Sequence, residues 1–407
     1  MTVRATEQSW MLDMGLAQGG IDALHPESKP LFEVLGYDPT DFDRVFALVK
    51  AGGMMPKAWA TVAAQVEERA EHHDKGGFAQ TAADLFQRAA VLWGRAQYSI
   101  RSTQDPRKTA FTARMNSCVA RVGELRANQV RRVVLDFEGQ EVYALLHLPA
   151  GDVRSAPAVI LLPGLDMVKE DYIQPAHRYY TSRGIVALSI DGPGQGETRT
   201  NGLTITLDNY ERAVSRAIDY LSDLPEVDGD RIGLFGISAG GYWGMRAAAH
   251  DTRLGATATF QTPCGDMSVF DRAQPSYKLN YMYISGYTDE ELFDREIIDH
   301  MPLGDLALRI TRPLLIGFGE FDEVTHLQQV LATYERITAP KEIRVYEDEF
   351  HPIGGVAAEY FRFGAEWLER ALDGAFQEPG RDVRHYHHRN GDTVDGTATP
   401  TWWTSAG

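Results

Sequence analysis

Cysteine is almost absent from this chain of 407 residues. Only Cys118 and Cys264 occur, and no Cys-x-x-Cys pair is present. Such a sequence does not encode a disulfide framework or a cysteine-based metal site. The sequence also lacks an H-E-x-x-H metal motif and a dinucleotide-binding fingerprint. We therefore expect no metal ion and no organic cofactor.

Basic residues and long apolar runs are also scarce. Lys and Arg total 40 against 57 Asp and Glu, a formal charge of −17, which argues against binding to nucleic acid or an anionic membrane. No apolar run approaches the ~18 residues of a membrane span, and the N-terminus has no features of a secretory signal. We expect a soluble cytoplasmic protein whose partner is a small-molecule substrate, with a homodimer left open.

The first part of the chain has helical periodicity. Helix starts are predicted at Asp38-Pro39, at Pro56 and at Asp105-Pro106, and Gly76-Gly77 separates the second helix from a third. Apolar residues recur at helical spacing in each of these segments. We therefore predict an N-terminal helical cap domain over residues 1–126.

Strand patterns begin near residue 130 and alternate with helical ones. Two extended runs flank a predicted turn at Glu138-Gly139, and six short β-branched runs follow at 158–164, 184–191, 231–236, 256–260, 312–320 and 342–349. Helical patterns lie between most of them, at 171–182, 207–223, 239–250, 326–337 and 355–373. This alternation predicts an α/β domain over 127–375 with a mostly parallel eight-stranded sheet. Residues 261–311 form a long insertion, and 376–407 are expected to be an extended or poorly ordered tail.

One motif carries the chemistry. Residues 236–240 read Gly-Ile-Ser-Ala-Gly and match G-x-S-x-G. With 38 glycines in the chain the match alone is weak, but an apolar strand precedes it and an Ala-rich helix follows. This context predicts a nucleophile elbow with Ser238 as the nucleophile. The alternative is a glycine-rich turn with a capping serine.

A serine nucleophile needs a base and an acid, which in this fold follow it in the order acid, histidine. His351 directly follows the last predicted strand and is our general base, whereas His326 is expected to begin a surface helix. Asp322 follows the preceding strand and is our choice of acid, with Glu320 as the alternative. The acid would orient the imidazole and stabilise its protonated form.

Two backbone N–H groups should form an oxyanion hole. We assign them to Ala239, which follows the nucleophile, and to Leu165, which follows Pro163-Gly164. The segment 191–197, DGPGQGE, lacks the lysine of a phosphate-binding loop. We interpret it as a tight structural loop beside the active site.

The elbow, the DGPGQGE loop and the segment PGLDMVKED together resemble one branch of the α/β hydrolases. This branch includes 2,6-dihydroxypseudooxynicotine hydrolase, fungal hydrolases that shorten polyketide pigment precursors, and esterase-like proteins grouped with the fermentation-respiration switch protein. The resemblance covers most of residues 1–375 and implies a helical region ahead of the catalytic domain. It places the triad on Ser238, Asp322 and His351, and it implies an additional acidic residue for which Asp266 and Asp271 are candidates, unless these are surface carboxylates.

The resemblance implies hydrolysis of a carbon–carbon bond next to a ketone, in a β-dicarbonyl or acylated aromatic substrate. A carboxylesterase or amidase with the same triad is the alternative. A non-catalytic binding protein is a third hypothesis, which the complete Ser–Asp–His order disfavours.

We also predict where the pocket lies. The helices at 40–125 should dock against 261–311, with the pocket between them and Ser238 at its floor. The aromatic candidates for the lining come from 261–311 and are Phe270, Tyr277, Tyr281, Tyr283 and Tyr287, with ordinary core packing as the alternative. The apolar surface by which the helices would dock includes Trp59, Trp93 and Phe111.

Overall fold

The N-terminal quarter of the chain is helical. The structure is a computed structural model, and it describes residues 5–8, 10–23, 25–126, 129–265, 267, 269–272 and 275–404. Its first helices are α1 (Trp10–Gly19), α2 (Lys29–Val34), α3 (Pro39–Leu48), α4 (Met55–Lys75), α5 (Ala79–Tyr98) and α6 (Pro106–Leu125). The four predicted helices are confirmed as α3 to α6, whereas α1 and α2 were not predicted.

Two of these helices begin where capping chemistry requires. The side chain of Asp38 accepts a hydrogen bond from the Thr40 N–H at 2.9 Å, and Asp105 accepts one from the Arg107 N–H at 2.9 Å. A proline occupies the first helical position in both, where its missing N–H costs nothing. The starts of α3 and α6 are therefore determined locally.

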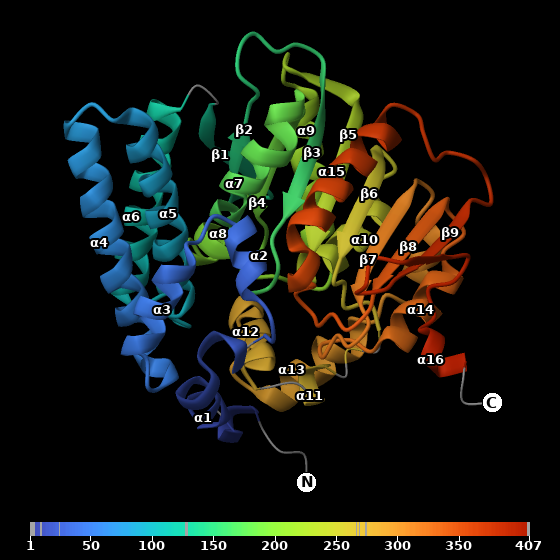
Figure 1. The fold of residues 1–407 in the computed structure, drawn as a ribbon, viewed down its shortest axis with the longest axis horizontal. Helices are drawn as coiled ribbons and strands as arrows, with labels where there is room; N and C mark the ends of the chain where they lie inside the picture. The colour runs from blue at the N-terminus through green and yellow to red at the C-terminus, as the bar shows by residue number, and fades with distance from the viewer. Residues whose placement is uncertain are drawn as a thin grey trace.

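A mostly parallel sheet crosses the centre of the molecule (Figure 1). Among the described residues it has ten strands in the order β1-β2-β4-β3-β5-β6-β7-β8-β9-β10. Strands β3 to β9 pair in parallel, and β1, β2 and β10 are antiparallel additions at the edges. The strands are β1 (Val130–Phe137), β2 (Gln140–His147), β3 (Ala156–Leu162), β4 (Val186–Asp191), β5 (Val227–Ile237), β6 (Leu254–Phe260), β7 (Leu314–Gly319), β8 (Lys341–Tyr346), β9 (Asp382–His387) and β10 (Thr393–Asp395).

The expected count of eight strands is therefore wrong by two, and both additional strands come from residues 376–407. β9 pairs in parallel with β8, from Lys341 opposite Asp382 to Tyr346 opposite His387. Its sequence, DVRHYH, is mostly polar because one side of this strand faces solvent, and only Tyr386 is fully buried. The polar pattern concealed a strand that completes the sheet instead of a loose tail.

Helices cover both faces of the sheet. On one face lie α9 (Asn209–Ser222), α10 (Ala239–His250) and α14 (Leu327–Arg336), and on the other lies α15 (Ala357–Leu372). Successive strand residues point to opposite faces, so Leu234 of β5 packs with the first group and Phe235 with the second. This alternation explains the continuous apolar runs in the central strands.

The predicted helix at 171–182 is broken into short turns. Helix α7 (Ile173–Pro175) is followed by a π-helical turn (Ala176–Tyr180) and a 3-10 turn (Thr181–Arg183). Pro175 has no N–H to donate, so a regular helix cannot continue through it without losing a hydrogen bond. The segment still buries Tyr179 and Tyr180 against the sheet.

The N-terminal helices share a core with one face of the sheet. Trp59 of α4 and Phe86 of α5 belong to the same buried apolar cluster as Phe235 and Phe361. Figure 1 shows α3 to α6 beside the sheet, and α1 close to α12 (Ser276–Ser285), α13 (Glu290–Glu296) and α11 (Val269–Arg272) at one end of it. The remaining short helices are α8 (Gly196–Thr200) and α16 (Thr401–Thr404).

Candidate active site

Ser238 lies at a sharp turn between β5 and α10. Its backbone has φ 53° and ψ −127°, a conformation that costs about 1–3 kcal/mol for a residue other than glycine. A Cβ on Gly236 would lie 2.4 Å from the Gly240 carbonyl oxygen, and one on Gly240 would lie 2.2 Å from the Leu162 carbonyl oxygen. Only glycine fits at these two positions, so the motif residues are those that this turn requires.

The structure brings the three predicted triad side chains together. The Nε2 atom of His351 lies 2.8 Å from the Ser238 Oγ atom, and its Nδ1 atom lies 2.8 Å from the Asp322 Oδ2 atom. Asp322 is fully buried, and its Oδ1 atom accepts hydrogen bonds at 2.8 Å from the N–H groups of Val324 and Thr325. This arrangement fixes the carboxylate and, through it, the ring of His351.

The charge of Asp322 also changes the basicity of His351. Burial alone would lower the pKa of His351, but the carboxylate of Asp322 outweighs burial and raises this pKa above its usual value. A raised pKa favours the imidazolium that forms when the ring accepts a proton from the serine.

The alternative residues lie elsewhere. Glu320 accepts hydrogen bonds from the Tyr386 hydroxyl at 3.0 Å and the Asp348 N–H at 3.1 Å, and it also contacts Trp402. It therefore anchors the C-terminal strands. His326 is exposed at the start of α14, as predicted.

The two residues proposed for the oxyanion hole flank Ser238. Ala239 is the first residue of α10, and Leu165 lines the same cavity as Ser238. A Cβ on Gly164 would lie 3.3 Å from the Ser238 Cβ atom, so the loop carrying Leu165 passes close to the nucleophile. Arg95, which sequence reasoning missed, supports this loop by donating to the Asp166 carbonyl oxygen at 2.7 Å.

A cavity of about 320 Å³ opens above Ser238. Its lining includes Ser238 and His351, Phe32, Trp59 and Tyr98 from the N-terminal helices, and Tyr277 from α12. The predicted location, between the N-terminal helices and residues 261–311, is therefore confirmed.

Most of the predicted aromatic lining is core. Of the five aromatic candidates from 261–311, Tyr277 lines the cavity, and Trp59 of α4 lines it as well. Phe270, Tyr281 and Tyr287 pack around Phe293, and Trp93 packs on Phe111. The docking of the N-terminal helices against residues 261–311 determines which aromatic side chains face the cavity. A local sequence pattern does not predict this docking.

The proposed accessory acids are not tested by this geometry. Asp266 lies outside the described residues, and Asp271 belongs to α11 without a described side chain. Both assignments stay predictions.

The DGPGQGE loop is a tight structural loop, as expected. Its Gln195 side chain donates to the Gly164 carbonyl oxygen at 2.8 Å and so holds the loop that carries Leu165. A Cβ on Gly196 would lie 2.2 Å from the Asp191 Oδ2 atom, so glycine is required there too.

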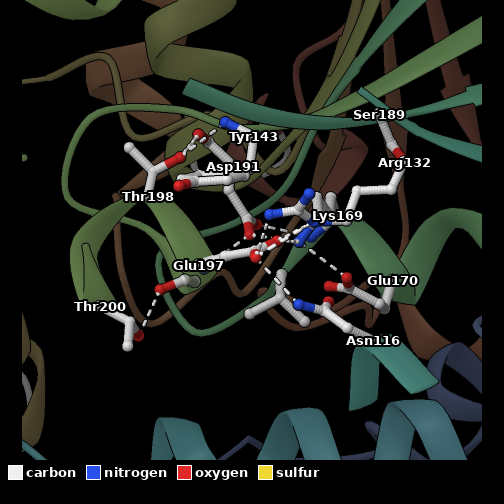
Figure 2. Close-up of polar contacts among 12 residues, drawn as sticks. Asn116, Arg132, Tyr143, Lys169, Glu170, Ser189, Asp191, Glu197, Thr198 and Thr200 are labelled. Atoms are coloured by element: carbon white, nitrogen blue, oxygen red, sulfur yellow. Dashed lines mark hydrogen bonds and ion pairs between the residues drawn. The ribbon is translucent and has the colours of Figure 1, made fainter. Parts of the chain in front are cut away.

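A sealed cluster of charges lies behind this loop (Figure 2). The Lys169 ammonium lies 2.7 Å from Glu170, 3.0 Å from Asp191 and 3.1 Å from Glu197. Arg132 of β1 also donates to Glu197, at 2.7 Å. Sequence reasoning missed this cluster, although Lys169 and Glu170 lie in the quoted PGLDMVKED segment.

Neither a metal site nor a membrane span is found in the part of the chain that the structure describes. Within the described ranges, no group of three or more His, Cys, Asp or Glu side chains is arranged to hold a metal ion. None of the helices in those ranges combines the length and apolar character that crossing a bilayer requires.

The fold and the turn at Ser238 define an α/β hydrolase. The family model of FrsA-like esterases matches residues 42–286, more than half of the chain. The chain therefore belongs to the FrsA-like esterase family, and it is an enzyme of the hydrolase class.

Individual relatives agree with this assignment. The chain is similar to 2,6-dihydropseudooxynicotine hydrolase of Paenarthrobacter nicotinovorans, at 28% identity over 65% of this chain and 70% of that protein. It is also similar to 20-hydroxy-prefusarin hydrolase of Gibberella moniliformis, at 28% identity over 58% of each chain. The match thus spans little more than half of the fungal protein.

A solved structure extends the likeness to the whole fold. The crystal structure of 2,6-dihydroxy-pseudo-oxynicotine hydrolase matches with a TM-score of 0.76 and 25% identity, covering 87% of this chain and 98% of that chain. The predicted α/β-hydrolase fold with an N-terminal helical region is therefore confirmed.

Proposed function

We propose that this chain is a serine hydrolase that cleaves a carbon–carbon bond next to a ketone, in a β-dicarbonyl or acylated aromatic substrate. The observation that carries the proposal is the continuous hydrogen-bond chain from Ser238 through His351 to Asp322, which opens on a cavity of about 320 Å³. The cavity has the size of a small-molecule site. We propose a cytoplasmic site of action, and a cap function for residues 1–126.

The geometry supports an acyl-enzyme mechanism. His351 accepts the Ser238 proton through Nε2 while the Oγ atom attacks the substrate carbonyl carbon. The N–H groups of Leu165 and Ala239 would stabilise the oxyanion that forms. Collapse of this intermediate breaks the carbon–carbon bond, and His351 returns its proton to the carbon of the leaving enolate or electron-rich arene. Water then hydrolyses the acyl group from Ser238, with His351 as the base.

The names of the relatives support the type of reaction only in part. The Paenarthrobacter protein and the Gibberella protein are named hydrolases, and the family is named for an esterase. A carboxylesterase or amidase using the same triad is therefore the second candidate function. The intact hydrogen-bond chain disfavours a non-catalytic role.

A matched substrate panel tests the proposal. Purified protein is assayed with acetylacetone or a phenyl-substituted β-diketone, with esters and with amides of the same acyl groups. We expect acid release from the β-diketones at a higher kcat/KM than from the unactivated esters. Turnover of esters or amides without any β-diketone cleavage would instead establish the second candidate.

A further inference from the structure

A second histidine lies on the wall of the cavity, beside the catalytic one. His25 comes from the segment before α2, more than three hundred residues away from His351 in the sequence. Its ring stacks on the ring of His351, with centroids 5.6 Å apart and planes 28° apart. Both side chains line the cavity with Ser238, so His25 lies within reach of a substrate bound there.

His25 has two polar partners of its own. Its Nδ1 atom lies 3.2 Å from the Glu323 Oε1 atom, and the Tyr277 hydroxyl lies 3.1 Å from Nδ1 and 3.2 Å from Nε2. The other oxygen of Glu323 accepts a hydrogen bond from the His351 backbone N–H at 2.9 Å. Glu323 therefore contacts both histidines, whereas Asp322 forms its hydrogen bond with His351.

The protonation states of Glu323 and Tyr277 suit a site that donates hydrogen bonds to a ligand. Burial would raise the pKa of Glu323, but its hydrogen bond with His25 and the charge of His351 lower it to about 2, so this residue is a carboxylate. Burial raises the pKa of Tyr277 well above its usual value, so its hydroxyl keeps its proton. When the ring of His25 carries both protons, Nδ1–H donates to the carboxylate of Glu323 and Nε2–H is a charge-assisted donor for a ligand in the cavity.

The position of His25 indicates which part of the substrate it meets. In acyl transfer the histidine that deprotonates the serine passes the proton to the leaving group, so the leaving group lies on the side of that histidine. His25 stacks on His351 and Tyr277 contacts His25, so both lie beside His351. The proposed oxyanion hole is on the loop of Leu165. His25 and Tyr277 are therefore placed to contact the leaving fragment.

We propose that His25 and Tyr277 form a hydrogen-bond donor site for the ketone oxygen of the leaving fragment, supported by Glu323. This inference rests on the proposed carbon–carbon bond cleavage. When the bond breaks, its electron pair moves onto the ketone and negative charge gathers on that oxygen. His351 then gives the proton it took from Ser238 to the enolate carbon, and a neutral ketone leaves. His25 and Tyr277 donate hydrogen bonds to the ketone oxygen and do not transfer a proton to it.

The test compares two substrates that share an acetyl group. Acetylacetone expels an enolate that needs stabilisation, whereas p-nitrophenyl acetate expels an anion that is already stable. The variants are His25→Gln and Tyr277→Phe, and the matched control is Tyr283→Phe, which makes the same change on the same helix. The ring of Tyr283 faces Arg199 at 4.7 Å instead of the cavity.

We expect kcat for acetylacetone to fall by about 10²-fold in His25→Gln, since losing one donor to developing charge has an effect of this order. The ratio of kcat for the diketone to kcat for the ester should fall at least tenfold in both variants and stay constant in Tyr283→Phe. Circular dichroism verifies that each variant is folded.

Two results would overturn the inference in distinguishable ways. If the wild-type protein hydrolyses the ester but not acetylacetone or any larger β-diketone, the proposed function fails and the donor site fails with it. If the wild-type protein cleaves the diketone and the variants lose both activities equally, or neither, the reaction stands and the donor site does not. Tyr277→Phe keeps the shape of the side chain, so it reports on the hydroxyl alone.

Discussion

Two buried clusters of charge lie at the carboxyl edge of this sheet, and they differ in one respect. In the candidate triad, the fully buried carboxylate of Asp322 contacts the ring of His351. The other side of this ring contacts the Oγ atom of Ser238, a residue that lines the cavity. In the cluster around Lys169, every charged group faces another charged group (Figure 2). Buried charge alone therefore does not identify a catalytic site. The candidate triad differs because Ser238 lines a cavity.

The charged cluster around Lys169 links elements of the fold. Asn116 of α6 donates to Glu197 at 2.9 Å, Arg132 of β1 donates to the same carboxylate, and Lys169 lies on the loop that continues from Leu165. The cluster thus connects an N-terminal helix, an edge strand and the loop that carries Leu165. We therefore expect changes in the triad to remove activity without loss of stability, and changes in the cluster to alter stability without removing activity.

The largest expected effect is that of Ser238→Ala. It should lower kcat by several orders of magnitude, on the order of 10⁶ as in a well-studied serine protease. The midpoint of thermal unfolding should stay within about 2 °C, since a methyl group replaces a small side chain at an unchanged turn. Kinetics and calorimetry on the same preparation measure both. Near-normal turnover by a folded Ser238→Ala protein would remove Ser238 from the mechanism.

A pair of histidine variants tests the assignment of His351 as the base. His351→Ala should inactivate to a similar extent, and His326→Ala should leave kcat/KM within about twofold because His326 is exposed outside the cavity. In the wild-type protein, kcat/KM should rise as the pH rises through the raised pKa of His351, because only the neutral ring accepts a proton. An inactive His326→Ala with an active His351→Ala would reverse the assignment.

A smaller effect, on stability, is expected from Lys169→Met. Removing one partner of a buried ion cluster leaves uncompensated charge and costs about 3–5 kcal/mol. Denaturant unfolding measures this cost, and Lys75→Met provides the control because Lys75 is exposed on α4. Equal unfolding free energies for the two variants would show that the cluster does not stabilise the fold.

The three candidate triad residues could be predicted because each lies within five residues after a strand that has a local pattern. Ser238 follows β5, Asp322 follows β7 and His351 follows β8. The cavity is different, since His25, Phe32 and Tyr98 reach it only through docking of the N-terminal helices on the sheet. Nothing near His25 in the sequence marks it as a neighbour of His351. The polar strand β9 was missed for a related reason, because its burial depends on β8.

The smallest expected effect at pH 5 is that of Glu170→Gln, and this effect grows as the pH rises. Lys169 and Arg132 carry two positive charges against Asp191 and Glu197, so a third carboxylate would be in excess. Burial and the nearby charge of Asp191 raise the pKa of Glu170 to about 8, against the lowering effect of Lys169. The folded protein therefore holds a proton at neutral pH that the unfolded chain releases.

The sign of the pH dependence follows from this difference. A carboxyl group whose pKa is raised on folding contributes stability below its ordinary pKa of about 4.5, and this contribution is lost as the pH rises towards about 8. Glutamine has the shape of the protonated acid and does not titrate. Glu170→Gln should therefore match the wild-type free energy of unfolding near pH 5 to within about 1 kcal/mol, and should exceed it increasingly from pH 5 to pH 8. Urea unfolding at several pH values measures the two curves, and parallel curves would mean that Glu170 is ionised in the folded protein.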